Sequence, residues 1–248
     1  MLMKLYKNSK IFFALTWIIA YCVLASLGDN LSAQIGILKC VTLPILAVLS
    51  VVLFVFLKKN GLLRKYGLCK PQIPASNMLF YIPLILLLTT NLWYGITLDV
   101  SPLDTCLYIL SMLLVGFLEE MIFRGLLFNA MAENDVKSAI VVSSVTFGIG
   151  HIINLVNGSA AQLLPNILQV IYAIAVGFAF VMIYVKSKSL IPCIVTHSIF
   201  NALSVFSNEA IITTQKRIIS CVWISVIAGT YALYLFLSIK NKTICEKS

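Results

Sequence analysis

"FLEEMIFRGLLF", residues 117–128, places two carboxylates and an arginine inside a run of apolar side chains. The run belongs to a longer window, residues 103–128, with the length and hydropathy of a membrane-spanning helix. On insertion scales, each charge at the centre of a span costs about 2.5 to 3.5 kcal/mol of insertion free energy, so the three charges cost roughly 9 kcal/mol. The Leu, Ile, Phe and Val residues of the window contribute roughly 6 kcal/mol in favour of insertion. The window therefore predicts a span whose charged side chains face a bundle interior or a wet cavity.

The composition of the whole chain agrees with a membrane protein. The chain has 248 residues, of which 60% are hydrophobic and 11% are charged, proportions outside the range of soluble globular domains. Because a span needs about 20 mostly apolar residues, the sequence predicts eight spans, at roughly residues 10–27, 35–57, 78–98, 103–128, 138–156, 163–185, 189–207 and 217–239. The expected fold is an all-α polytopic bundle in which residues 1–248 form a single membrane domain.

The formal net charge of +9 is explained by topology. Most of the basic residues fall in segments on one predicted side of the membrane, such as Lys4, Lys7, Lys10 and the polar loop 58–77. By the positive-inside rule both termini are predicted to be cytoplasmic, and some basic residues are expected to contact anionic lipid. We therefore expect membrane lipid, and no nucleic acid, among the partners.

Neither a cleaved signal peptide nor a disulfide or thiolate metal site is expected from the sequence. "VLA" at residues 23–25 resembles a weak signal-peptide cleavage site, but the apolar run before it is longer than a usual signal core, so we expect an uncleaved span. The seven cysteines are scattered and contain no paired motif, so no disulfide framework or thiolate metal site is expected.

Spacing divides the charged residues of the opening stretch into two roles. Glu120 and Arg124 are four residues apart and share a helix face, whereas Glu119 is turned by about 100° from Glu120. One carboxylate can therefore pair with the arginine while the other stays free, a common way to separate a structural carboxylate from a general base. We assign Glu120 to the pair with Arg124 and Glu119 to the chemistry. The alternative is a buried ion network without chemistry.

The two histidines of the chain both fall inside predicted spans, His151 in "FGIGHIIN" and His197 in "VTHSIFNAL". His197 and Asn201 are four residues apart and can bind the same oxygen, and Phe147 is placed to pack beside His151. Such a set suits hydrolysis by activated water, with Glu119 as the base and His151 positioning the water. His197 and Asn201 would donate hydrogen bonds to the oxyanion of a tetrahedral intermediate.

Three short motifs in order carry a family resemblance. "EEMIFRG" resembles the EExxxR motif, "FGIGH" the FxxxH motif and "HSIFN" the HxxxN motif of the CPBP family, which includes the CAAX prenyl endopeptidases and the bacterial Abi proteins linked to bacteriocin self-immunity. The motifs extend from residue 119 to residue 201. The resemblance implies an intramembrane endopeptidase, with residues 103–207 as its catalytic core helices and a cavity that opens to the cytoplasmic side.

Carried over by position, the resemblance makes Glu119 and His151 the activators of water and makes His197 and Asn201 the oxyanion donors. Glu120 and Arg124 complete the first motif and shape the site. Members of the family are commonly labelled metalloproteases, and Glu119, His151 and His197 would be the ligands of a zinc ion. We favour no metal cofactor, because HExxH is absent and the histidines come from different spans.

Two further functions remain open at this point. One is a non-enzymatic immunity or regulatory membrane protein, and the other is a transporter that uses the buried charges as a relay. The favoured function is hydrolysis of a peptide bond in a membrane-associated protein or peptide, in a multi-pass protein of the bacterial plasma membrane. The sequence does not indicate whether the substrate is prenylated.

Overall fold

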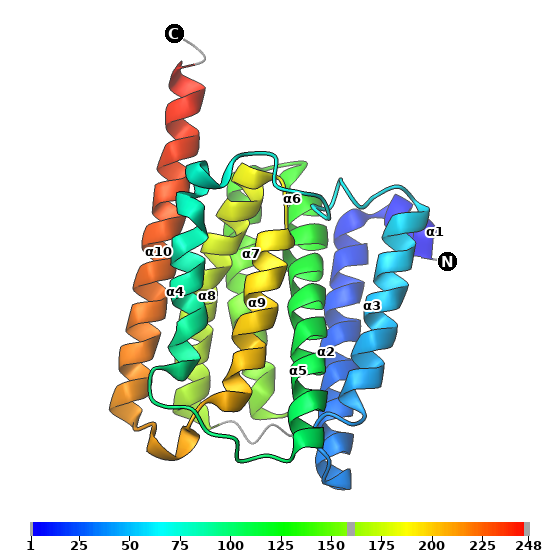
Figure 1. Cartoon of the computed structure of the whole chain (residues 1–248). Coiled ribbons are helices and arrows are strands. Elements are labelled where there is room, and N and C mark those ends of the chain that lie inside the picture. Colours follow the sequence, from blue (N-terminus) through cyan, green and yellow to red (C-terminus); the bar gives the residue numbers. More distant parts are fainter. Residues whose placement is uncertain (1, 158–161, 246–248) are drawn as a thin grey trace.

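The computed structural model describes residues 2–157 and 162–245, with side chains described up to residue 239. Within these ranges the chain forms an α-helical bundle without β-strands (Figure 1). Its helices are α1 (Leu2–Asn8), α2 (Lys10–Ile35), α3 (Thr42–Lys59), α4 (Ile82–Thr89), α5 (Pro102–Glu119), α6 (Asn129–Ala132), α7 (Val136–Gly150), α8 (Leu163–Ser187), α9 (Ile191–Leu203) and α10 (Thr214–Cys245). The all-α polytopic fold predicted from the sequence is confirmed.

Seven helical segments of the described chain are long and apolar enough to cross a membrane. They are Lys10–Ile35, Thr42–Lys59, Ala75–Leu92, Pro102–Ala132, Val136–Leu155, Leu163–Ser187 and Thr214–Ile239. The window predicted at 189–207 corresponds to the shorter apolar segment Ile191–Phe206. The count of eight spans and the side on which the termini lie stay predictions.

The first span is longer than predicted because polar residues on its last turns find partners in residues 39–42, at and just before the start of α3. The Thr42 hydroxyl donates to the Asp29 carboxylate at 2.6 Å, and the Lys39 ammonium lies 2.8 Å from the same oxygen. The Ser32 hydroxyl accepts the backbone N–H of Val41 at 3.0 Å. These contacts satisfy groups that would otherwise be costly in an apolar environment, so the helix continues to Ile35 instead of ending near residue 27.

The third span is predicted at 78–98 but occupies Ala75–Leu92. Leu79, Phe80 and Tyr81 have positive φ angles of 50°, 50° and 59°, so the regular helix begins only at Ile82. After Leu92 the chain leaves the helix, with Gly95 at φ 101°. The span therefore ends earlier than predicted because of backbone conformation after Leu92 that hydropathy does not report.

The ends of the bundle differ in the segments that they contain (Figure 1). The N-terminal helix α1, the loop between α3 and α4 and the C-terminal end of α10 lie at one end. The loops that follow α2, α4 and α9 lie at the opposite end. Inside the bundle α5 contacts α3 and α9, while α8 contacts α7 and α10.

Helix α7, which ends directly before His151, begins at a side-chain cap. The Asp135 carboxylate accepts the backbone N–H groups of Lys137 and Ser138, both at 3.1 Å, and satisfies donors that the first turn leaves free. Hydrogen bonds from the hydroxyl and the backbone of Ser138 lower the pKa of Asp135, so the cap keeps its charge in neutral solution.

The charged span changes helix type at the predicted site. α5 ends at Glu119, and residues Glu120–Phe128 form a π-helix in which every residue is buried. The Asn129 amide donates to the carbonyl oxygens of Arg124 and Gly125 at 3.2 and 2.7 Å, and the Ser143 hydroxyl donates to that of Phe123 at 2.9 Å. π-Helical turns are rare and often mark functional sites. Side-chain donors thus supply the wider turns with hydrogen bonds inside the apolar bundle.

Small residues allow the helices of the site to approach closely. A Cβ atom on Gly116 of α5 would lie 2.6 Å from the backbone nitrogen of Ser198 in α9, and one on Gly148 of α7 would lie 2.8 Å from that of Ile174 in α8. Backbone atoms cannot rotate away, so only glycine fits at these crossings. The α5–α9 contact brings the carboxylates at the end of α5 to the helix that carries His197.

We predict that Gly116→Ala lowers stability by about 1 to 3 kcal/mol, because the added methyl group forces α5 and α9 apart. The thermal unfolding midpoint of the detergent-solubilised protein measures the effect. Gly229→Ala is the matched control, since nothing lies within 4 Å of a Cβ atom there. Equal midpoints for the two variants would show that the crossing tolerates a larger residue.

Candidate active site

The predicted ion pair of the opening stretch is present. Arg124 Nη1 donates to Glu120 Oε1 at 3.0 Å, and both side chains are fully buried. The guanidinium also lies over the ring of Phe147, with Cζ 3.9 Å from its centroid. Two guanidinium nitrogens, Nε and Nη2, have no hydrogen-bond partner among the described residues. Since the pair has only one hydrogen bond, its aromatic contact contributes to holding the arginine.

His197 lies between the two carboxylates. Its Nδ1 is 2.9 Å from Glu120 Oε1, and its Nε2 is 3.5 Å from Glu119 Oε2. The nearby carboxylate oxygen requires Nδ1 to carry a proton. His197 thus connects the buried Glu120–Arg124 ion pair to Glu119, the predicted general base.

Glu119 has one constrained and one open oxygen. The hydroxyl of Tyr21, in α2, donates to Oε1 at 2.7 Å. Oε2 is buried and makes no hydrogen bond to any described residue, and its contact with His197 Nε2 is 3.5 Å long. A buried carboxylate oxygen normally has a partner, so an open one at the wall of a cavity can accept a hydrogen bond from water or a ligand.

His151 is oriented by its own helix. Its Nδ1 lies 3.1 Å from the backbone carbonyl oxygen of Phe147, so Nδ1 donates and Nε2 is the acceptor of the neutral ring. The rings of Phe147 and His151 pack edge to face with centroids 5.1 Å apart, as the spacing predicts. The histidine is the first residue of a 3-10 turn, His151–Leu155, and not part of the span's regular helix.

A cavity of about 820 Å³ connects the candidate residues. Its wall includes Glu119, His151 and Asn201 together with Phe147 and Tyr21, whereas Glu120, Arg124 and His197 are not among the lining residues. Three of the four predicted catalytic residues therefore line one space. The Glu120–Arg124 ion pair and His197 lie outside this lining and contact the residues that form it.

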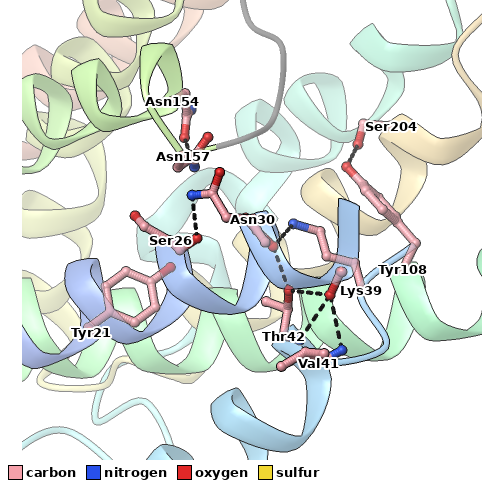
Figure 2. A network of polar contacts seen from close by, with 12 residues as sticks. Tyr21, Ser26, Asn30, Lys39, Val41, Thr42, Tyr108, Asn154, Asn157 and Ser204 are labelled. Carbon is pink, nitrogen blue, oxygen red and sulfur yellow. Dashed lines mark hydrogen bonds and ion pairs between the residues drawn. The ribbon is translucent and has the colours of Figure 1, made fainter. Parts of the chain in front are cut away.

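Polar side chains from several segments also line the cavity, and Figure 2 shows some of their contacts. Tyr108 of α5 and Ser204 after α9 form a hydrogen bond at 2.8 Å, and the Asn157 amide donates to the Asn154 side-chain oxygen at 3.0 Å. Amides and hydroxyls offer both donors and acceptors, which are the groups that a peptide backbone requires.

The zinc alternative fits these residues poorly. Among residues 2–157 and 162–245 there is no group of three or more His, Cys, Asp or Glu side chains that could hold a metal ion. His197 Nδ1 lies 2.9 Å from Glu120 Oε1, and Nε2 lies 3.5 Å from Glu119 Oε2. A reaction without a metal ion stays a prediction.

Comparison with known proteins identifies the region that contains the site. Residues 101–203 match the family model described as type II CAAX prenyl endopeptidase Rce1-like. Residues 101–203, the Rce1-like domain, are thus similar to this family over less than half of the chain. No curated protein matches the chain. The Rce1-like domain covers α5 to α9 and every predicted site residue, and it supports the class of CAAX-protease-like intramembrane hydrolases.

Sequence reasoning missed two features of this candidate site. Tyr21 lies outside residues 101–203, and no spacing rule relates a tyrosine in the first span to Glu119. The contact of His197 with Glu120 was missed because it depends on how α5 and α9 cross. A signal for that crossing was present in Gly116, whose absent side chain permits it.

We predict that Glu120→Gln destabilises the protein by about 3 to 5 kcal/mol, because it leaves the Arg124 charge buried without a counter-charge. The double variant Glu120→Leu/Arg124→Met removes both charges and is expected to recover much of this loss. Unfolding midpoints of the single and double variants in detergent measure the difference. A single variant as stable as the wild type would contradict the role given to the pair.

Proposed function

We propose that this protein is an intramembrane endopeptidase that hydrolyses a peptide bond with water activated by Glu119 and His151. The observation that carries the proposal is that Glu119, His151 and Asn201, which come from three different segments of the chain, line one cavity. A water molecule bound to Oε2 would stand in the same space as a bound peptide. The Rce1-like domain supports the same class of reaction.

The proposed reaction has two steps that return Glu119 to its starting state. The water oxygen attacks the carbonyl carbon of the peptide while Glu119 takes one water proton, and His151 Nε2 accepts a hydrogen bond from the other. The Asn201 side-chain amide donates to the resulting oxyanion. As the tetrahedral intermediate collapses, the C–N bond breaks and the proton on Glu119 passes to the leaving nitrogen.

His197 and Tyr21 act as positioning residues in this proposal. The resemblance implies an oxyanion donor at His197, but the contacts of both ring nitrogens with carboxylates favour a role in holding Glu119. Tyr21 fixes the other oxygen of the same carboxylate at 2.7 Å. The contribution of α2 to the site also favours a first span that is retained in the mature protein.

The central test compares Glu119→Gln and His151→Ala with the wild type. Both are expected to insert and fold but to lose about 10²- to 10⁴-fold in peptide cleavage, because each removes a group that acts on the water. Membrane peptidomics of cells carrying each variant measures cleavage and identifies the substrate. Glu133→Gln, at a surface position near the end of α6, is the matched carboxylate control.

Cleavage by Glu119→Gln at the wild-type rate would contradict the proposal. If cells carrying Glu119→Gln were protected against a bacteriocin as well as wild-type cells, without any peptide cleavage, the non-enzymatic immunity or regulatory function would be favoured. Ion flux in proteoliposomes that depends on Glu119 would favour a transporter.

We further propose that the reaction needs no metal ion. Purified protein treated with excess chelator is expected to keep its cleavage rate, and added zinc is expected not to raise that rate. The reason is that Glu119 supplies the base and Asn201 supplies the oxyanion donor. Loss of the rate on chelation and its recovery only with zinc would overturn this proposal.

A further inference from the structure

The cavity extends from Glu119 toward one end of the bundle. Its wall passes Met112 and Tyr108 along α5 and reaches the segment 36–39, Asp104 and Glu209. These residues belong to the loops and helix ends that lie opposite α1 (Figure 1). The mouth of the cavity therefore lies at the end of the bundle away from the loop between α3 and α4.

Packed side chains close the path in the other direction. All residues of the π-helical segment Glu120–Phe128 are buried, and Met121 and Ile122 have no exposed surface. This layer lies between Glu119 and the end of the bundle that contains α1. A peptide reaching Glu119 from that end would have to displace the core of the protein.

The two ends carry different charges. The end that contains α1 bears the basic residues of the N-terminus and the loop after α3, which are Lys4, Lys7, Lys58, Lys59, Arg64, Lys65 and Lys70. The mouth end bears Lys39, Lys216 and Arg217 with the acidic residues Asp29, Asp99, Asp104 and Glu209. Under the positive-inside rule the basic end is cytoplasmic and the mouth faces the other side of the membrane.

The charges on the cavity wall favour a cationic ligand. Asp29 is paired with Lys39 at 2.8 Å, and Glu209 is paired with Arg217, so these groups neutralise one another. Asp104 instead accepts the Leu38 N–H and the Ser101 hydroxyl, both at 2.8 Å, and has no Lys or Arg partner among the described residues. Asp104 therefore leaves the mouth end of the lined space with a negative charge that no described Lys or Arg side chain neutralises.

We propose that the substrate is a peptide of net positive charge that enters the cavity from the extracytoplasmic side of the membrane. The inference rests on the proposed endopeptidase function and specifies its substrate class. It differs from the cytoplasmic opening that the family resemblance implies. A prenylated C-terminus in the cytoplasm would lie at the closed end of the bundle.

Cysteine labelling tests the side of access without relying on activity. Glu209→Cys at the mouth and Lys59→Cys at the basic end are treated with a membrane-impermeant maleimide in intact cells, against the wild-type background of native cysteines. We expect labelling of Glu209→Cys in intact cells and labelling of Lys59→Cys only after permeabilisation. The reverse pattern would overturn the proposed side of access even if the protein is a peptidase.

Charge preference is tested with two fluorogenic peptide pools that differ only in Lys or Glu at positions flanking a variable centre. The purified full chain in proteoliposomes is expected to cleave the Lys pool preferentially. Asp104→Asn should lower kcat/KM for that pool roughly tenfold at low salt and less at high salt. Asp99→Asn is the matched control, because Asp99 lies at the same end but outside the cavity wall.

The possible results separate the two proposals. Equal cleavage of both pools, or an equal effect of Asp104→Asn on both, would overturn the cationic preference while leaving the endopeptidase function intact. Cleavage of neither pool by wild-type protein would count against the endopeptidase function itself, and the labelling pattern would still decide which way the cavity faces.

Discussion

A fully buried carboxylate and guanidinium, Glu120 and Arg124, determine how the centre of this bundle is arranged. Charges at membrane depth are stable only when other protein groups surround them. Glu120 is held by the arginine and by His197, and the guanidinium lies on the ring of Phe147. The pair therefore ties the span that carries it to α9 and α7, which are the helices that bring the histidines to the site.

The same arrangement separates the two adjacent carboxylates. Glu120 is enclosed behind the cavity wall, whereas Glu119 lies on the wall with one oxygen fixed by Tyr21 and the other open. The change from α- to π-helix occurs between these two residues. Along this span, the residues before Glu119 line a polar cavity, whereas the residues after it are packed in the apolar core.

Local spacing predicted the features that one helix can determine alone. The Glu120–Arg124 pair and the contact of Phe147 with His151 follow from residues four apart, and hydropathy found the spans to within a few residues in most cases. Residues 101–203 also carry the family match that the three motifs indicated. These signals are encoded in short stretches of sequence.

Features that depend on packing between distant segments could not be predicted in this way. The position of His197 between two carboxylates requires the close crossing at Gly116, and the hydrogen bond from Tyr21 requires α2 to lie beside α5. The π-helix and the extension of the first span to Ile35 depend on side-chain donors supplied from outside those segments. Hydropathy averages over such donors and does not report them.

The most direct test of the account is a structure of the protein with a peptide phosphinate bound, because the tetrahedral phosphinate resembles the intermediate of attack by water. The account predicts that the phosphinate lies in the cavity, with one oxygen at Glu119 and His151 and the other at the Asn201 amide. A phosphinate bound outside the cavity, or bound there through a metal ion held by the two histidines, would contradict it.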